Sequence, residues 1–410
     1  MKYRNILYSS LAGLLLFASC TQTHENAEQV SNLPNMYPDY ADVTIPVNIA
    51  PLNFEIRDKH LTNIETILTI EGADANDAAN TLTATSNSQN LKFDMKDWKA
   101  FLQKAVNKNI KVQIYSKSDE GDWTAFKPFT WQVVSDSIDS YLTYRLIEPD
   151  YEVWNKIQIK QRCIENWEEK ILADHNLQEN RCMNCHAFGN QNPNLSMLYV
   201  RGEGGGAILN RNGKLRKLNL KNDNLISSSV YYGFCPSGKY VTFSTNIIIP
   251  AFHANADKRL EVYDSKSDTY HSWSHTGRWF VFASKRDDGL YGKPYFCYVD
   301  RQCKAHKPFV LPQKEPTFYD DCLKSFNIPE LSRGPVPFDA IDIENVLKQK
   351  SSNKKKQKRS CYHIATGAFS IHIHLNSSLF TLCPETPINR AFQGVKSYQR
   401  LFTHSSPLIT

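Results

Sequence analysis

The chain has 410 residues, of which 41% are hydrophobic and 12% aromatic, and this composition is typical of a folded protein with more than one core. The formal net charge is +6, but segment 351–410 holds eight basic residues against Glu385 alone, so the rest of the chain is nearly neutral. A nucleic-acid-binding protein needs a basic face on its folded body. We therefore expect no nucleic-acid partner.

The N-terminus has the pattern of an export signal. Lys2 and Arg4 precede an apolar run over 6–18 that is too short to span a bilayer, and the run ends in Ala18-Ser19-Cys20. This resembles a bacterial lipobox and predicts a signal peptide over 1–19, a lipidated Cys20 and a polar tether over 20–36. The expected location is the periplasm or the outer membrane, held by the lipid. The alternative is an ordinary secreted protein that is cleaved near Ala18.

Residues 37–149 alternate short β-type runs with turn residues, which predicts an antiparallel, immunoglobulin-like β-sandwich. One helix is expected within it, because Trp98, Phe101, Leu102 and Val106 fall at helical spacing. The expected strands cover 43–49, 64–70, 110–115, 123–134 and 141–147.

Residues 150–199 are predicted to form a helical linker. Asp150 is a suitable N-cap for a helix that runs to about Leu172, with an apolar stripe through Trp154, Ile157, Ile164, Trp167 and Ile171. The stripe would pack either on the sandwich or on a haem face.

Residues 200–347 are predicted to form a partial β-propeller. The segments 236–244 and 275–283 align 39 residues apart as a glycine turn followed by an aromatic strand, and edge-like strands follow at 260–264 and 295–300. There is room for three or four blades only, so we expect this part to be less stable than the sandwich. The glycine-rich stretch 201–206 precedes a strand and an Asn212-Gly213 turn, which indicates a tight loop rather than a phosphate site.

Cys182-Met183-Asn184-Cys185-His186 is the attachment motif of c-type cytochromes. Two thiols at this spacing add to the two vinyl groups of haem, and the adjacent imidazole reaches the iron. The motif predicts one covalently attached haem c, held by Cys182, Cys185 and His186, with His186 as the iron ligand. Export supports this, because c-type haem is attached outside the cytoplasm.

Several alternatives remain open at this site. A thioredoxin-type pair would follow a βαβ unit, a zinc site would need a second ligand pair, and the motif could be vestigial. Met197, expected in a loop, is the tentative sixth iron ligand, with His175, His253 or water as alternatives. Most of the remaining cysteines are expected to be buried thiols, and they are Cys163, Cys235, Cys297, Cys303 and Cys322.

From about Tyr37 to Leu347 the chain resembles a family of exported lipoproteins of Gram-negative anaerobes, which combine a TolB-like propeller with a cytochrome c motif. The resemblance departs at Asp268-Thr269, where further blades would be expected, and over 351–410, whose lysine run and His372-Ile373-His374 match nothing in the family. It rests on segments 37–40, 45–46, 145–149, 155–162, 189–193, 252–253, 270–274 and 286–291 around the haem motif.

The sequence thus predicts a mainly β protein with a sandwich, a short helical haem-binding segment, a partial propeller and an atypical basic tail over 351–410. No Ser/His/Asp or paired-carboxylate constellation is present, which favours a haem electron carrier or redox sensor over an enzyme. The propeller would be its docking surface for an envelope protein or redox partner. The alternatives are a protein- or glycan-binding module with structural haem and, third, a haem peroxidase.

Overall fold

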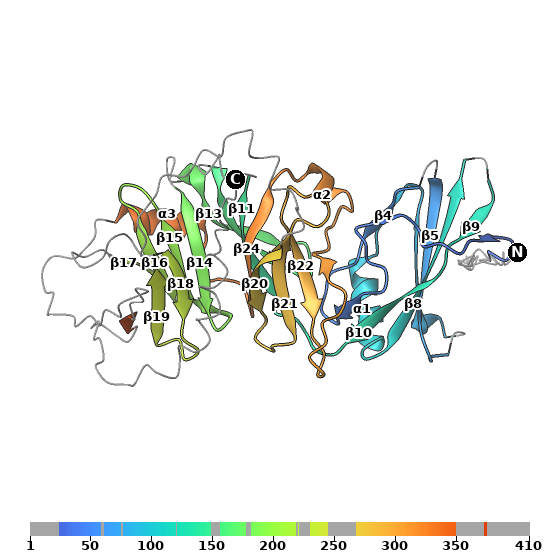
Figure 1. Cartoon of the computed structure of the whole chain (residues 1–410), viewed down its shortest axis with the longest axis horizontal. Coiled ribbons are helices and arrows are strands. Elements are labelled where there is room, and N and C mark those ends of the chain that lie inside the picture. Colours follow the sequence, from blue (N-terminus) through green and yellow to red (C-terminus); the bar gives the residue numbers. More distant parts are fainter. Residues whose placement is uncertain are drawn as a thin grey trace, which may run out of the picture.

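The computed structural model describes residues 24–58, 61–74, 77–119, 121–148, 156–177, 182–218, 220, 230–244, 268–349 and 373–374. These residues form a mainly β protein with six sheets and few helices, as expected. Figure 1 shows the sheets in succession along the longest axis. The predicted signal peptide and Cys20 lie outside the described residues, as does most of the tail.

The N-terminal part is built from two sheets around one core. Two of its strand pairs, β1 with β9 and β10 with β3, run parallel, so the expectation of a purely antiparallel sandwich is wrong. The three-stranded sheet consists of β2 (Met36–Tyr37), β4 (Phe54–Ile56) and β7 (Asn90–Leu91). The seven-stranded sheet consists of β1 (Glu28–Gln29), β3 (Thr44–Pro46), β5 (Leu61–Ile70), β6 (Thr81–Ser86), β8 (Asn109–Ser118), β9 (Trp123–Ala125) and β10 (Phe129–Val134).

The expected helix of this part is confirmed as α1 (Met95–Lys104). Asp94 caps its N-terminus, because the carboxylate accepts hydrogen bonds from the backbone N–H of Lys96 at 2.8 Å and of Asp97 at 3.0 Å. The helix buries Trp98, whose indole N–H donates to the Ile49 carbonyl at 3.0 Å. Local chemistry therefore both starts the helix and fixes its buried face.

The expected helix over 150–172 is wrong. Its described part contains β12 (Gln158–Cys163) and β13 (Glu169–Asp174), which form a sheet with β11 (Tyr141–Ile147) and β24 (Ser325–Ser332). A β-branched residue such as Ile159 suits a strand, and β11 offers it a ladder to pair with. The predicted boundary at 149 is wrong for the same reason, because β11 pairs with β12 and β24 instead of the sandwich.

The next sheet is a meander of β14 (Met183–Gly189), β15 (Asn192–Val200), β16 (Gly206–Arg211) and β17 (Lys214–Leu218). Asn212 and Gly213 have φ of 53° and 77°, as a two-residue hairpin turn requires. The glycine-rich stretch is a tight loop as expected, since a Cβ on Gly205 would lie 2.3 Å from the Val200 carbonyl oxygen.

The two aligned segments give equivalent structures. Gly238 and Gly277 both have φ of 66°, and each turn leads into a strand, β19 (Tyr240–Ser244) or β21 (Trp279–Ser284). β19 pairs with β18 (Val230–Phe234) and β25 (Ile373–His374), while β21 lies between β20 (Asp268–Trp273) and β22 (Lys293–Tyr298), followed by β23 (Phe309–Val310). β22 is buried throughout, so it is not the edge strand that was expected.

Three of the sheets are four-stranded and antiparallel, which is the form of a propeller blade. One of them, the sheet of β13, β12 and β11, is completed by β24, which pairs with β11 although β11 lies some 180 residues earlier in the chain (Figure 1). The short helices α2 (Phe318–Asp321) and α3 (Ala340–Lys348) flank β24 in the sequence, and the 3-10 turns cover Ala78–Asn80 and His175–Leu177.

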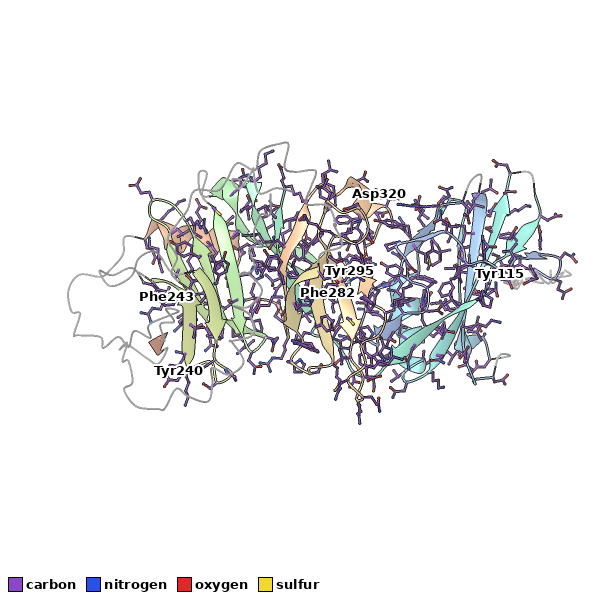
Figure 2. The ribbon with its side chains drawn as sticks, in the orientation of Figure 1. Tyr115, Tyr240, Phe243, Phe282, Tyr295 and Asp320 are labelled. Carbon is purple, nitrogen blue, oxygen red and sulfur yellow. The ribbon has the colours of Figure 1, made fainter. Side chains whose placement is uncertain are left out.

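One buried cluster runs from the sandwich into the β20–β23 sheet without interruption. Trp279 is fully buried there and donates its indole N–H to the Asp136 carbonyl at 2.7 Å, and Tyr298 donates to the Asp136 carboxylate at 2.7 Å. In Figure 2, Phe282 and Tyr295 lie in this central sheet and Tyr115 lies in the sandwich. The two parts therefore share a core.

Candidate haem site

The haem motif starts just before β14 and continues into it. Cys182 is half-buried at the start of the strand, and His186 is buried in its middle. The helical haem-binding segment expected from the sequence is therefore wrong, since the motif lies on a strand. In a regular strand, neighbouring residues point to opposite faces of the sheet, which would separate position 185 from position 186.

A β-bulge in β14 interrupts this alternation of faces at the motif. Asn184 pairs with Tyr199 and Ala187 pairs with Met197, so three steps along β14 match two steps along β15. The extra residue lies within Cys185-His186. A bulge interrupts the alternation of faces and redirects side chains, so strict alternation does not apply between the second thiol position and the imidazole position.

The same kind of bulge occurs in an edge strand of three further sheets. β18 has it at Tyr231-Tyr232, β20 at Tyr270-His271 and β24 at Ile328-Pro329. The first residue of each of these pairs has a positive φ, with 55° for Tyr231, 57° for Tyr270 and 50° for Ile328. These edge strands also adjoin one another, since β14 contacts β18 and β24, and β24 contacts β20. The haem motif therefore occupies one of four equivalent bulges on adjoining edges.

His186 faces the bulge of β24. Burial, together with the nearby Arg145, lowers the pKa of His186 to about 4, and the carbonyls of Thr143 and Ile328 oppose this shift. Neither ring nitrogen has a partner with hydrogen-bond geometry. A neutral buried imidazole with unused nitrogens is costly unless a ligand uses it, and a metal ligand must be in the neutral form.

Two further ionisable side chains lie beside the motif, and sequence reasoning did not find them. Buried Arg145 of β11 lies close enough to lower the pKa of both His186 and Cys182. Glu330 of β24 accepts a hydrogen bond from Phe188 N at 2.9 Å, and burial raises its pKa to about 8. Both come from the sheet that β24 completes, which no local pattern predicts.

The tentative sixth ligand, Met197, is buried in the strand that pairs with β14. Met197 lies in β15, not in a loop, and packs with Tyr232, Val241 and Phe243 on one face of the sheet. Phe188, whose ring lies 6.5 Å from that of His186, packs in the cluster on the other face. The loop expected around Met197 is wrong, whereas its role as sixth ligand stays a prediction; His175 is only half-buried beside Asp174, and His253 lies outside the described residues.

Thiol chemistry at Cys182 differs from that of a redox pair. Burial raises the pKa of Cys182, whereas a reactive thiol of this type has a lowered pKa at a helix N-terminus.

Among the other free cysteines only Cys163 and Cys297 are buried and Cys303 is exposed, so the expectation that most are buried is wrong. Within the described part of the chain no three His, Cys, Asp or Glu side chains gather as a metal site would require.

The residues present fit a covalently attached haem better than they fit zinc or a dithiol. Both ring nitrogens of His186, the one side chain of the motif that would bind iron, are among the buried polar atoms of the described residues that have no hydrogen-bond partner. The neighbouring thiol of Cys182 is half-buried with a raised pKa, and Arg145 supplies positive charge for acidic groups of a ligand.

Comparison with solved structures gives distant likenesses only. TolB from Acinetobacter baumannii is similar over 53% of this chain and 60% of its own, with 12% identity and a TM-score of 0.21. This chain thus spans less than two thirds of that protein. A putative 6-phosphogluconolactonase from Bacteroides uniformis is similar over 62% of this chain and 83% of its own, with 8% identity and a TM-score of 0.13. Both TM-scores are too low to assign the fold of either protein to this chain. The sequence matches no family model, and no curated protein matches it.

Proposed function

We propose that this chain is an envelope protein with one c-type haem, which carries electrons or senses redox state. The observation that supports this most directly is the haem motif at a bulge of β14, with the buried neutral imidazole of His186 lacking a hydrogen-bond partner. When bound, the haem would supply one-electron chemistry at iron.

The protein's own residues would have distinct roles. Cys182 and Cys185 would form the thioethers, and His186 would ligate the iron. Arg145 lies where its positive charge would disfavour oxidation of the iron and so raise the reduction potential. β11 and β24 exclude water from the imidazole. The sheets would present the docking surface for an envelope redox partner, in a partial propeller.

Covalent haem is tested by staining for haem after denaturing electrophoresis of protein made with a c-haem maturation system. We expect the wild type to stain and the double variant Cys182→Ala/Cys185→Ala to lose the stain, because thioether bonds survive denaturation. The matched control Cys297→Ala/Cys322→Ala removes two thiols elsewhere and should stain. Absence of stain in the wild type would refute the proposal, and a reversible one-electron titration would separate electron transfer from structural haem.

Membrane attachment is proposed to occur through lipidated Cys20. Within the described residues no helix is long and apolar enough to cross a bilayer. We expect Cys20→Ala to move the protein from the membrane to the soluble envelope fraction, because acyl chains would be the anchor. Fractionation followed by immunoblotting measures this, with Cys303→Ala as control. Persistent membrane association of Cys20→Ala would contradict the lipid anchor and leave the haem proposal unaffected.

A further inference from the structure

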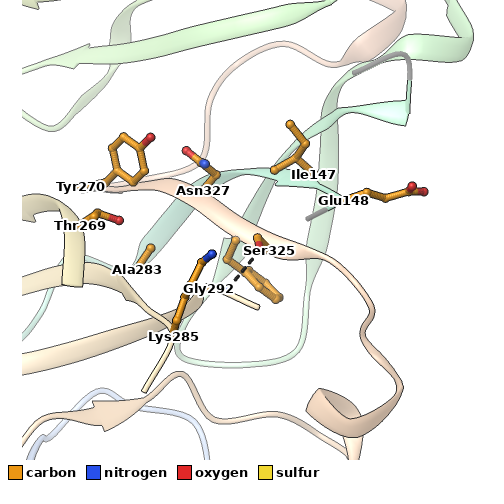
Figure 3. A pocket seen from close by; sticks show the side chains of 10 residues that line it. Ile147, Glu148, Thr269, Tyr270, Ala283, Lys285, Gly292, Ser325 and Asn327 are labelled. Atoms are coloured by element: carbon orange, nitrogen blue, oxygen red, sulfur yellow. Dashed lines mark hydrogen bonds between the residues drawn. The ribbon is translucent and has the colours of Figure 1, made fainter. Parts of the chain in front are cut away.

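A small pocket lies where β24 meets β20. Figure 3 shows its lining side chains, with Tyr270 at one rim, Asn327 above and Lys285 below. Its volume is about 60 Å³, enough for a group of a few atoms. The lining residues are Ile147, Glu148, Thr269, Tyr270, Ala283, Lys285, Gly292, Ser325, Phe326 and Asn327.

The polar groups of the pocket are mainly hydrogen-bond donors. Lys285 makes no ion pair with a carboxylate of the described residues. The Ser325 hydroxyl accepts a hydrogen bond from Gly292 N at 3.0 Å, so its own proton is available to donate. The hydroxyls of Thr269 and Tyr270 add two further donors. Donors around a cation form the complement of an anion.

The one carboxylate of the pocket is engaged elsewhere. Glu148 pairs with Lys156 at 3.2 Å, and in Figure 3 its carboxylate points away from Lys285. The charge that faces the open space is therefore that of the Lys285 ammonium.

The backbone at the rim is strained. Tyr270 has φ of 57° and is 44% exposed, so burial of its ring does not explain why a bulky residue occupies this conformation. Such a residue costs about 1–3 kcal/mol, and strain of this kind gathers at functional sites. The bulge of Tyr270 is equivalent in register to that of Cys185-His186 in β14. One bulge thus carries the haem motif, and another places a phenol at a pocket.

We propose that this pocket binds a phosphate group, held by Lys285 with the hydroxyls of Tyr270, Ser325 and Thr269. A tetrahedral oxoanion of few atoms matches the size of the pocket, and its negative charge and acceptor oxygens match the donors. This site is separate from the haem motif and does not depend on haem attachment.

Isothermal titration of the full chain with inorganic phosphate and with glycerol phosphate tests the site, with ionic strength held constant by sodium chloride. We expect saturable binding with one site per chain. Tighter binding of the ester would identify the group as part of a larger ligand, and tighter binding of inorganic phosphate would identify the free ion. Lys285→Met should weaken binding at least tenfold, whereas the exposed Lys304→Met should bind as the wild type.

Tyr270→Phe is the second variant, because it removes one hydroxyl and keeps the ring. It should weaken binding several-fold, and circular dichroism confirms that each variant is folded. Absence of saturable binding by both probes would overturn the proposal, as would wild-type affinity of folded Lys285→Met. If Lys285→Met does not fold, wild-type affinity of Tyr270→Phe would overturn it.

Discussion

His186 of the haem motif and Glu330 beside it respond to pH in opposite directions. The pKa of His186 is lowered to about 4 by burial, so its folded state resists protonation, and stability is lost as pH falls below about 6.5. The pKa of Glu330 is raised to about 8, so its folded state holds a proton that the unfolded chain releases above about 4.5. Stability from this carboxyl is therefore lost as pH rises from 4.5 to 8.

Only Glu330 of this pair titrates between pH 6.5 and 8, and this window isolates it. We expect the free energy of unfolding of the wild type to fall with rising pH there, by at most about 1.4 kcal/mol per pH unit. Glu330→Gln should flatten this slope, because the amide oxygen still accepts from Phe188 N but cannot ionise. Urea unfolding at several pH values measures it. The exposed Glu168→Gln should keep the wild-type slope, and an unchanged slope in Glu330→Gln would show that Glu330 ionises normally.

At the scale of elements, the edge strands β14, β18, β20 and β24 are the repeated feature. Each has a bulge at the same register, and in β24 the bulge contains Pro329, which has no N–H to leave unpaired. The bulge in β24 gives His186 the carbonyl of Ile328 as a neighbour, while that in β20 places Tyr270 at the pocket. Bulges of one kind therefore place residues both beside the haem motif and at the pocket.

At the scale of the whole molecule, the sandwich and the β20–β23 sheet should unfold together because they share one core. Trp279→Ala removes a fully buried side chain and its hydrogen bond to Asp136, and this should cost about 3–5 kcal/mol. Hydrogen exchange should then accelerate in β8 and β10 as well as in β21 and β22.

Trp273→Ala is the matched control in the same sheet, because Trp273 is 47% exposed and should cost far less. Acceleration by Trp279→Ala in β21 and β22 alone would contradict a shared cooperative unit. It would instead favour the sequence-based expectation of a sandwich that is more stable than the rest.

The sequence by itself determined features that local chemistry controls. Helical spacing of apolar residues predicted α1, Asn212-Gly213 predicted the hairpin turn, and the repeated glycine turns predicted β19 and β21. The spacing of Cys182, Cys185 and His186 predicts haem attachment for the same reason, since it depends only on neighbouring residues.

Only the tertiary structure decided features that depend on distant partners. The segment over 158–174 forms strands because β11 and β24 complete a sheet with it, against the helical spacing of its apolar residues. That sheet also places Arg145 and Glu330 beside β14, and the pairing of β15 with β14 and β16 places Met197 in a strand instead of the expected loop. No local pattern records such pairings, because the residues that meet, such as Tyr141 and Ser332, are separated by as many as 191 positions in the chain.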